Sequence, residues 1–189
     1  MNSSQKRFFD SFREVVKAVS STLDLNQVMD LLVKNVTEAM ELKACAVRLL
    51  NPKSRTLDLL ASCGLSQDYI RKGPVDADRS IASAAEGNIV VVRDAGKDPR
   101  AQYQQEAVAE GISTIVSVPL SVKGRTIGVL RIYTHQPRDF SQEELDFAQA
   151  LAEIGAIAIE NARMYERIKK DYESVMSDLY TFVGYRRSI

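Results

Sequence analysis

The sequence predicts an α+β fold in which a small antiparallel sheet is joined to long helices. Two candidate β-hairpins support the sheet, one over residues 45–62 and one over residues 114–133. The helical spacing of apolar residues before and after these hairpins supports the helices. The last helix is the longest, because its apolar pattern runs to Phe182 without a break.

The first forty residues predict two helices. Residues 5–22 carry one apolar stripe at helical spacing, formed by Phe8, Phe12, Val15, Val19 and Leu23. Asp24 and Gln27 read as a capping box that starts a second helix after a break near 23–26. The apolar positions of the second helix are expected to face a core.

The segment between the hairpins predicts two short helices and one strand. A helix over 80–87 is expected to end at Gly87, and a buried strand is expected over 89–92. A loop rich in charged and turn residues follows, and then a helix that ends at Gly111. Loops of this kind commonly carry ligand contacts on a rigid scaffold.

Composition sets the broad class of the protein. The 189 residues suit one domain with extra helices, and 25 basic and 25 acidic side chains give zero net charge, so neither nucleic acid nor an anionic membrane is an expected partner. No apolar run approaches the roughly 20 residues that span a bilayer, and no signal peptide begins the chain, so a cytoplasmic location is expected. Two cysteines and the lone His135 leave no expected metal site.

Across about residues 10–168 the chain resembles the GAF domain family. The segments that carry the resemblance are SSTLDLNQVMDLLV, the hairpin ending in ASCGL, RSIASAAEGNIVVVRDAGKDPR, SVPLSVKGRTIGVLRIY and FSQEELDFAQALAEIGAIAIENARMYERI. The resemblance implies a PAS-like α+β fold with a central five- to six-stranded antiparallel sheet. It also implies helices packed on one face, a small-ligand pocket under loops on the other, and long terminal helices that commonly mediate dimers.

On this basis the chain divides into three parts. Residues 1–23 form an N-terminal dimerisation helix, residues 24–162 form the GAF domain, and residues 163–189 extend the long helix and end in a tail. The long helix carries a heptad seam whose spacings alternate between three and four. The seam consists of Leu151, Ile154, Ala158, Asn161, Tyr165, Ile168, Tyr172, Val175, Leu179 and Phe182.

A second apolar stripe accompanies this seam only as far as Ala162, so beyond that point the helix needs a partner. We expect a homodimer in which the seam joins the N-terminal stripe formed by Phe8, Phe12, Val15 and Val19. Asn161 and the tyrosines of the seam favour a four-helix bundle over a two-stranded coiled coil. The alternative is that the segment folds back onto its own domain.

The positions that would line the pocket follow from the expected elements and from the resemblance. They are Ser62, Cys63, Ile81, Ala82, Asp94, Arg100, Tyr103, Thr114 and Arg131. The arginines of this set suit a small anionic or carboxylate ligand, because a guanidinium binds such groups with two hydrogen bonds. Alternatively, Asp94 caps a turn, Arg100 is solvated and Arg131 pairs with a carboxylate.

The ligand and the output of the domain stay open. GAF domains that bind cyclic nucleotides resemble an N-K…F-x-x-x-D-E pattern, whereas this chain has Thr134-His135 and Glu144-Leu145 around a retained Phe140, which argues against cyclic GMP. We therefore expect a non-catalytic small-molecule sensing module in signal transduction, acting on a partner protein or as part of a longer chain. The alternatives are a docking module without a ligand, or a methionine sulfoxide reductase that uses Cys63.

Overall fold

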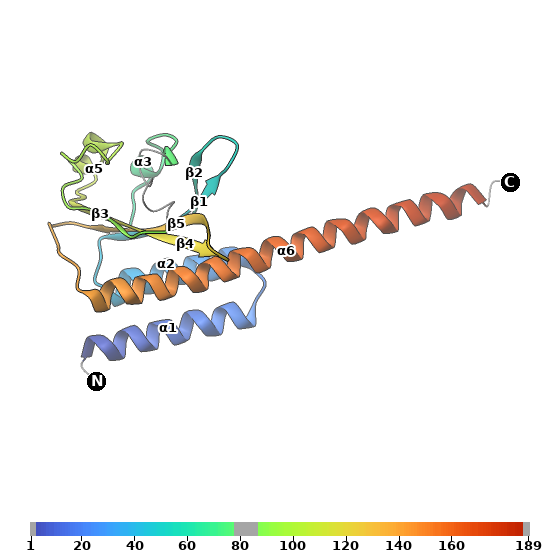
Figure 1. Ribbon diagram of the computed structural model, residues 1–189, viewed down its shortest axis with the longest axis horizontal. Helices are drawn as coiled ribbons and strands as arrows, with labels where there is room; N and C mark the ends of the chain where they lie inside the picture. Colours follow the sequence, from blue (N-terminus) through green and yellow to red (C-terminus); the bar gives the residue numbers. More distant parts are fainter. Residues whose placement is uncertain (1–2, 78–86, 187–189) are drawn as a thin grey trace.

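Three long helices and a five-stranded sheet form the two main layers of the molecule (Figure 1). The computed structural model describes residues 3–77 and 87–186. In Figure 1 the helices lie under one face of the sheet, while short helices and loops lie over the other face. The expected helix over 80–87 lies, apart from Gly87, outside the described residues.

Helix α1 (Ser3–Ser21), helix α2 (Leu25–Ala39) and helix α6 (Gln142–Arg186) form the helical layer. The side chain of Asp24 accepts hydrogen bonds from the backbone N–H groups of Asn26 and Gln27, at 3.0 and 3.2 Å. These bonds satisfy two of the free N–H groups at the start of α2, so the chain restarts a helix at the predicted place.

A capping box starts α6. Glu144 donates its N–H to Ser141 Oγ at 3.3 Å, and its carboxylate accepts the N–H of Ser141 at 2.9 Å. The helix that follows runs for 45 residues.

The sheet is antiparallel throughout the described residues, in the order β2-β1-β5-β4-β3. The strands are β1 (Ala44–Asn51), β2 (Thr56–Cys63), β3 (Val90–Val92), β4 (Thr114–Val122) and β5 (Arg125–Thr134). Lys123 and Gly124 join β4 to β5 with φ angles of 52° and 75°, the left-handed pair that a two-residue hairpin turn requires. The α+β fold with helices on one face of the sheet is as predicted.

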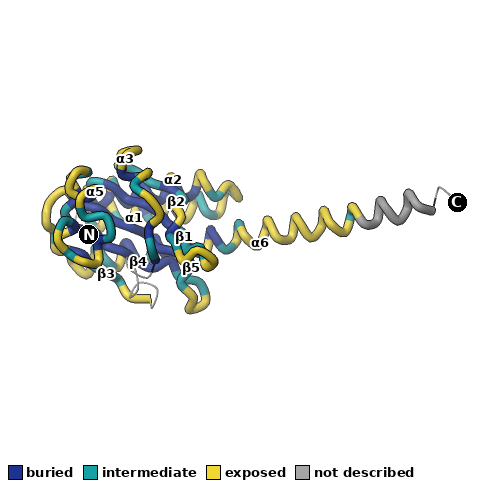
Figure 2. The backbone as a smooth tube through the Cα atoms, turned by 90° about the horizontal axis from the view of Figure 1, so that it is seen from above, coloured by how far each residue is buried: buried dark blue, intermediate teal, exposed yellow. Residues whose placement is uncertain are grey.

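The main hydrophobic core lies between the sheet and the helices, and Figure 2 shows the buried chain gathered there. Alternate strand residues point into it, including Val47, Val118, Leu130 and Ile132, all with no exposed surface. We call this side of the sheet the helix-side face. The opposite, loop-side face lies under α3 (Gln67–Ile70), α5 (Gln104–Ala109) and the loops around them.

The α1 stripe packs inside its own chain. Val15 is fully buried, and the ring of Phe8 stacks on Phe147 of α6 with centroids 4.4 Å apart. Of the residues predicted for the dimer interface, those that the structure packs into the core of one chain are Phe8, Phe12, Val15, Val19, Leu151, Ile154 and Ala158. An apolar stripe signals burial without naming what covers it, and here α2 and α6 of the same chain cover it.

Helix α6 extends past the domain instead of folding back onto it (Figures 1 and 2). Beyond Ala162 its described side chains are almost all exposed, including the predicted seam residues Tyr165, Ile168, Tyr172 and Val175. The side chain of Leu179 lies outside the described part.

Candidate functional site

Two arginines and a tyrosine share the loop-side face of the sheet. Arg131 of β5 lies opposite Ala46 of β1 and opposite Ser117 of β4. Directly opposed residues of antiparallel strands point to the same side, and so do residues two apart on one strand. Arg48, two residues after Ala46, and Tyr133, two residues after Arg131, therefore lie on the same face as Arg131.

All three side chains are buried, and two of them, Arg48 and Tyr133, have polar atoms without a partner among the described residues. Arg48 is 4% exposed and donates from Nη1 to the carbonyl of Leu57 at 3.0 Å, but its Nε and Nη2 have no partner within residues 3–77 and 87–186. Arg131 is 7% exposed and donates from Nε to Ser117 Oγ at 3.3 Å. Tyr133 is fully buried, and its hydroxyl has no partner in the described part of the chain. Buried polar atoms without partners are uncommon, so these atoms mark this part of the loop-side face as the candidate site.

Helix α3 brings a phenol and an amine to the same place. Ser66 caps α3 by accepting the N–H of Tyr69 at 3.1 Å. The Tyr69 ring meets Tyr133 edge to face, with centroids 6.1 Å apart at 86°. Lys72 lies with Nζ 3.5 Å from the centre of the Tyr69 ring and donates to the Tyr69 carbonyl at 2.9 Å. We call Arg48, Tyr69, Lys72, Arg131 and Tyr133 the arginine–tyrosine cluster.

Burial and mutual repulsion shift the ionisation of the cluster. Burial raises the pKa of Tyr69 well above its ordinary value, and the nearby Tyr133 adds to this, although Arg131 and Arg48 oppose it. Burial, together with the positive charges of Arg48 and Arg131, lowers the pKa of Lys72 from 10.5 to about 7, although Glu106 and Glu110 oppose the shift. These mutual effects place the cationic groups close enough to interact.

A buried ion pair fixes the frame around the cluster. Glu110, at the end of α5, accepts from Lys43 Nζ at 3.1 Å and from the N–H and hydroxyl of Ser66. The Glu110 and Lys43 side chains are only 7% and 10% exposed. Burial alone would raise the pKa of Glu110, but the bonds from Ser66 and Lys43 outweigh burial and lower it. Glu110 thereby ties α5 to the start of β1 and to the start of α3.

Of the predicted pocket residues, two lie on the loop-side face and one borders the cluster. Arg131 belongs to the cluster, and Ser62 lies opposite Ala46 on the same face. Tyr103 borders the cluster, because Lys72 Nζ lies 5.6 Å from the centre of the Tyr103 ring. The Tyr103 hydroxyl donates to the Pro74 carbonyl at 2.7 Å. Ile81 and Ala82 lie outside the described residues.

Three other predicted residues lie away from the cluster. Asp94 is exposed and accepts the N–H of Gly96, as in a capped turn. Arg100 is exposed and forms a fork with Asp98, with N–O distances of 2.6 to 3.2 Å. Thr114 is buried at a sheet end, where it donates to the Arg93 carbonyl. The alternative interpretations of Asp94 and Arg100 as a turn cap and a surface group therefore describe the structure better than the pocket assignment.

Both cysteines lie on the helix-side face. Cys63 is paired with Cys45 across β1 and β2, and both thiols are free. Cys45 is fully buried in the main core and Cys63 packs against that core, so neither faces the cluster. Burial raises the pKa of the Cys45 thiol far above its ordinary value, which leaves it protonated and unreactive at neutral pH. The prediction that Cys63 lines the pocket is wrong, because consecutive strand residues point to opposite faces.

The sequence-based prediction missed Arg48, Tyr69, Lys72 and Tyr133. One available signal was the arginine inside the strand sequence CAVRLL, since a charged residue within a buried strand usually has a specific role. Alternation along that strand places Arg48 on the face of Ala46, away from Val47. The described residues hold no cluster of metal-ligating side chains, and none of the described helices is apolar enough over its length to cross a membrane.

Comparisons with known proteins place the fold in a family. A family model described as the GAF domain matches residues 22–160. The methyl sulfide methyltransferase-associated sensor of Methanosarcina acetivorans is 27% identical over 167 residues, which cover 85% of this chain and 17% of that protein. The formate hydrogenlyase transcriptional activator of Salmonella typhimurium is 22% identical over 181 residues, 89% of this chain and 26% of that protein. The chain thus spans about a quarter or less of the length of these curated relatives.

Solved structures share the fold at lower identity. The GAF domain of a phosphoenolpyruvate-protein phosphotransferase from Coxiella burnetii superposes with a TM-score of 0.76 at 21% identity, covering 88% of this chain and 99% of that one. The free methionine-R-sulfoxide reductase of Neisseria meningitidis superposes with a TM-score of 0.71 at 19% identity, covering 87% and 95%. These neighbours show the architecture, and the family match covers most of the chain. The chain belongs to the GAF domain family.

Proposed function

We propose that the chain is a non-catalytic sensing and regulatory module that binds a small molecule on the loop-side face of its sheet and signals as a dimer. The observation that carries the sensing part is the set of unpartnered polar atoms on Arg48 and Tyr133. A buried polar group without a hydrogen bond destabilises a protein by about 1–3 kcal/mol. A bound ligand would supply the missing partners. The names of the relatives, a sensor and a transcriptional activator, also fit a regulatory role.

A retained or added ligand tests the sensing function. Native mass spectrometry of the purified chain should show extra mass that disappears on denaturation, or a metabolite library should raise the melting temperature. Ala46→Val fills the sheet surface beside Arg131 and should remove the response, while Ala101→Val, also buried but on the loop before α5, should keep it. The absence of both retained mass and stabilising compounds would favour the alternative, a docking module without a ligand.

A reductase function has less support from the geometry. A substrate on the loop-side face would be separated from Cys63 and Cys45 by the sheet itself. Thiol chemistry requires an accessible thiolate, and Cys45 is fully buried. We expect that neither the wild type nor Cys63→Ser reduces free methionine sulfoxide faster than the uncatalysed rate.

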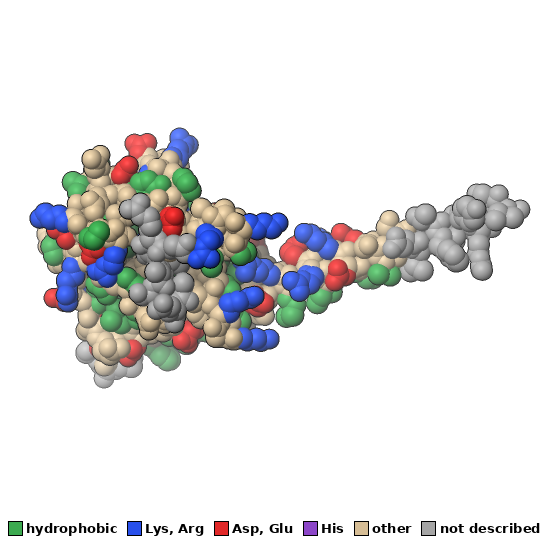
Figure 3. Space-filling model, turned by 45° about the horizontal axis from the view of Figure 1, so that its top comes forward, with side chains coloured by type: hydrophobic (Ala, Val, Ile, Leu, Met, Phe, Trp, Pro, Cys, Tyr) green, Lys and Arg blue, Asp and Glu red, His purple; other side chains and the backbone are tan. Residues whose placement is uncertain are grey.

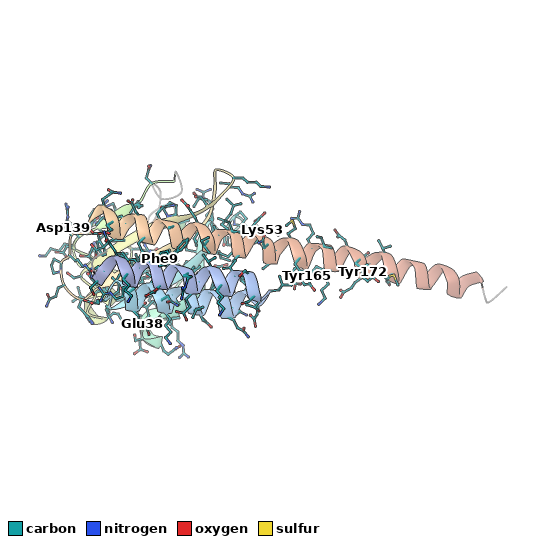
Figure 4. The ribbon with its side chains drawn as sticks, turned by 90° about the horizontal axis from the view of Figure 1, so that it is seen from below. Phe9, Glu38, Lys53, Asp139, Tyr165 and Tyr172 are labelled. Carbon is teal, nitrogen blue, oxygen red and sulfur yellow. The ribbon has the colours of Figure 1, made fainter. Side chains whose placement is uncertain are left out.

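The dimer part of the proposal relies on an exposed apolar stripe, which we call the outer stripe. Its members are Phe9, Val16, Leu23, Ile157, Met164, Tyr165, Ile168, Tyr172 and Val175, all exposed. Phe9, Val16 and Leu23 follow one another at intervals of seven, as do Ile157 and Met164, so the stripe has the heptad period of a helix interface. Figure 4 shows Phe9 on α1, with Tyr165 and Tyr172 along α6 beyond the end of α1.

The partner that fits this stripe is a second copy of the chain. Figure 3 shows hydrophobic side chains along one side of the projecting helix, and charged side chains of both signs on the rest of it. A projecting helix with one apolar side needs a partner with the same period, and a second α6 supplies one. The interface then uses the outer stripe in place of the buried α1 stripe expected from the sequence.

Light scattering after size-exclusion chromatography tests the dimer. The wild type should be dimeric, and Ile168→Glu should be monomeric, because a carboxylate would be buried in the seam. Ser174→Glu adds the same charge at an exposed position outside the stripe and should stay dimeric. A monomeric wild type, or a dimeric Ile168→Glu variant, would contradict the proposal.

A further inference from the structure

The arginine–tyrosine cluster carries positive charge that the described protein residues do not balance. Two guanidinium groups, on Arg48 and Arg131, lie at 4% and 7% exposure, and Lys72 lies beside them. No described carboxylate forms an ion pair with either arginine, and the carboxylate of Glu110 is occupied by Lys43 and Ser66. A buried guanidinium that lacks a counter-charge is strongly unfavourable, whereas a bound anion removes that cost.

We infer that the sensory site binds a small oxyanion, a carboxylate or a phosphate, held by Arg48 and Arg131 with the Tyr133 hydroxyl. This inference rests on the proposed sensing function and adds the chemical class of its ligand. It replaces Arg100 with Arg48 as the second arginine of the site.

The free donors of Arg48 fit such an anion in shape. Its Nη1 is used by the Leu57 carbonyl, and the two donors left over are Nε and Nη2. These two nitrogens point their hydrogens along the same edge of the guanidinium plane, as parallel donors. Two parallel N–H groups match the two oxygens of one carboxylate or two oxygens of a phosphate. A neutral ligand with a single acceptor would leave one of them unpaired.

The register places the remaining donors around that edge. Arg131 is the diagonal neighbour of Arg48 on the adjacent strand, a separation of about 7–8 Å that long side chains bridge. Tyr133 lies two residues further along β5, and its buried hydroxyl is free to donate. The residues directly opposite Arg131, Ala46 and Ser117, are small.

Lys72 adds a third cation, at the rim of the site. Its Nζ lies over the Tyr69 ring. The charges of both arginines lower the pKa of Lys72, while those of Glu106 and Glu110 raise it. Negative charge bound between the arginines would favour the protonated amine. Anion binding near neutral pH should therefore be accompanied by proton uptake, which a neutral ligand would not cause.

The decisive experiment compares anions with neutral molecules of the same shape. The full chain, refolded from denaturant to remove any retained ligand, is titrated with acetate, lactate, oxalate and inorganic phosphate, and with acetamide, lactamide and oxamide. Sodium chloride at matched ionic strength controls for screening. We expect saturable stabilisation by at least one anion and none by its amide.

Three variants locate the effect. Arg48→Met should weaken the binding of that anion by at least about tenfold, which corresponds to 1.4 kcal/mol. Arg48→Lys keeps the charge but loses the paired donors and should also weaken binding. Arg100→Met removes the exposed arginine that the sequence favoured and should leave binding unchanged.

The outcomes separate the inference from the function on which it rests. Binding of a neutral compound that survives Arg48→Met would overturn the anion inference and leave the sensing function standing. Anion binding that is lost in Arg100→Met but kept in Arg48→Met would also overturn it. If no compound binds and no mass is retained, the sensing function and the anion inference both fail.

Discussion

Both faces of the sheet bury their side chains deeply, but the helix-side face buries apolar side chains and the loop-side face also buries polar ones. On the helix-side face, Leu130 and Ile132 of β5 are fully buried among the helices. On the loop-side face, Arg131 and Tyr133 of the same strand are 7% and 0% exposed. Apolar side chains at that depth stabilise the fold by burial, whereas polar ones destabilise it unless they are paired. One strand therefore supplies stability through one set of alternate residues and a binding surface through the other.

The largest expected effect comes from the helix-side face. Leu130→Ala removes a fully buried side chain from the main core and should reduce the free energy of unfolding by about 2–5 kcal/mol. Leu23→Ala makes the same chemical change at a side chain that is 66% exposed, and should change the stability of the single chain by less than about 0.5 kcal/mol. Urea unfolding at low protein concentration measures both. Similar losses in the two variants would contradict the assignment of the main core.

A smaller loss is expected where the loop-side elements are tied together. Glu110→Gln weakens the charge-assisted bonds from Lys43 and Ser66 and should cost about 1.5–3 kcal/mol. Glu106→Gln, on the same helix but exposed, is the matched control and should be close to neutral. The difference in stability between the two variants should narrow as the pH falls below the ordinary range of glutamate. The reason is that the bonds that lower the pKa of Glu110 stabilise the fold only while its carboxylate is ionised. A cost that stays constant down to acidic pH would show that packing, not charge, is lost.

The buried arginines of the loop-side face should not stabilise the ligand-free fold. Arg48→Met replaces a buried cation by an apolar chain of similar length, and such replacements are often neutral or stabilising. In the absence of ligand we therefore expect the variant to be as stable as the wild type, or more stable. Denaturation of the ligand-free protein measures this stability. A loss as large as that of Leu130→Ala would mean that Arg48 serves the fold and not a ligand.

The sequence predicted the features that depend on neighbouring residues. Asp24 starts its helix as predicted, because a cap is a contact between residues two or three apart. Lys123 and Gly124 form the turn of the hairpin predicted over residues 114–133 for the same reason. The long seam of α6 is also local, since its period is set by the geometry of one helix.

The features that depend on pairing between distant segments could not be predicted. Arg48 and Arg131 meet only because β1 pairs with β5 in one register, and a shift by one residue would move either to the other face. Cys63 and Ser62 were both assigned to the pocket, although adjacent strand residues face opposite sides. The α1 stripe was recognised as apolar, but only the packing of Phe8 on Phe147 shows that its own chain covers it.

The smallest expected effect is a pH dependence of stability that belongs to the loop-side face alone. Lys72 has a pKa of about 7 in the folded chain and about 10.5 when unfolded, so between these values the unfolded chain binds more protons. The free energy of unfolding should therefore rise with pH through this window. The contribution of Lys72 to stability should be lowest below pH 7, where the buried amine is protonated beside Arg48 and Arg131. Tyr69 and Cys45 act in the opposite direction only near and above their ordinary values of 10 and 9, so the range up to about pH 8.5 isolates Lys72.

Comparing the wild type with Lys72→Met between pH 6.5 and 8.5 measures this contribution, because the other titrating groups are common to both proteins. The wild type should gain stability relative to the variant as the pH rises, and the gain should shrink when a saturating anion occupies the site, since the anion favours the charged amine. No comparable difference is expected for Lys169→Met, whose side chain is exposed on the projecting helix. Parallel pH curves for wild type and Lys72→Met would remove Lys72 from the cluster. An undiminished gain in the presence of a bound anion would place that anion elsewhere than between the two arginines.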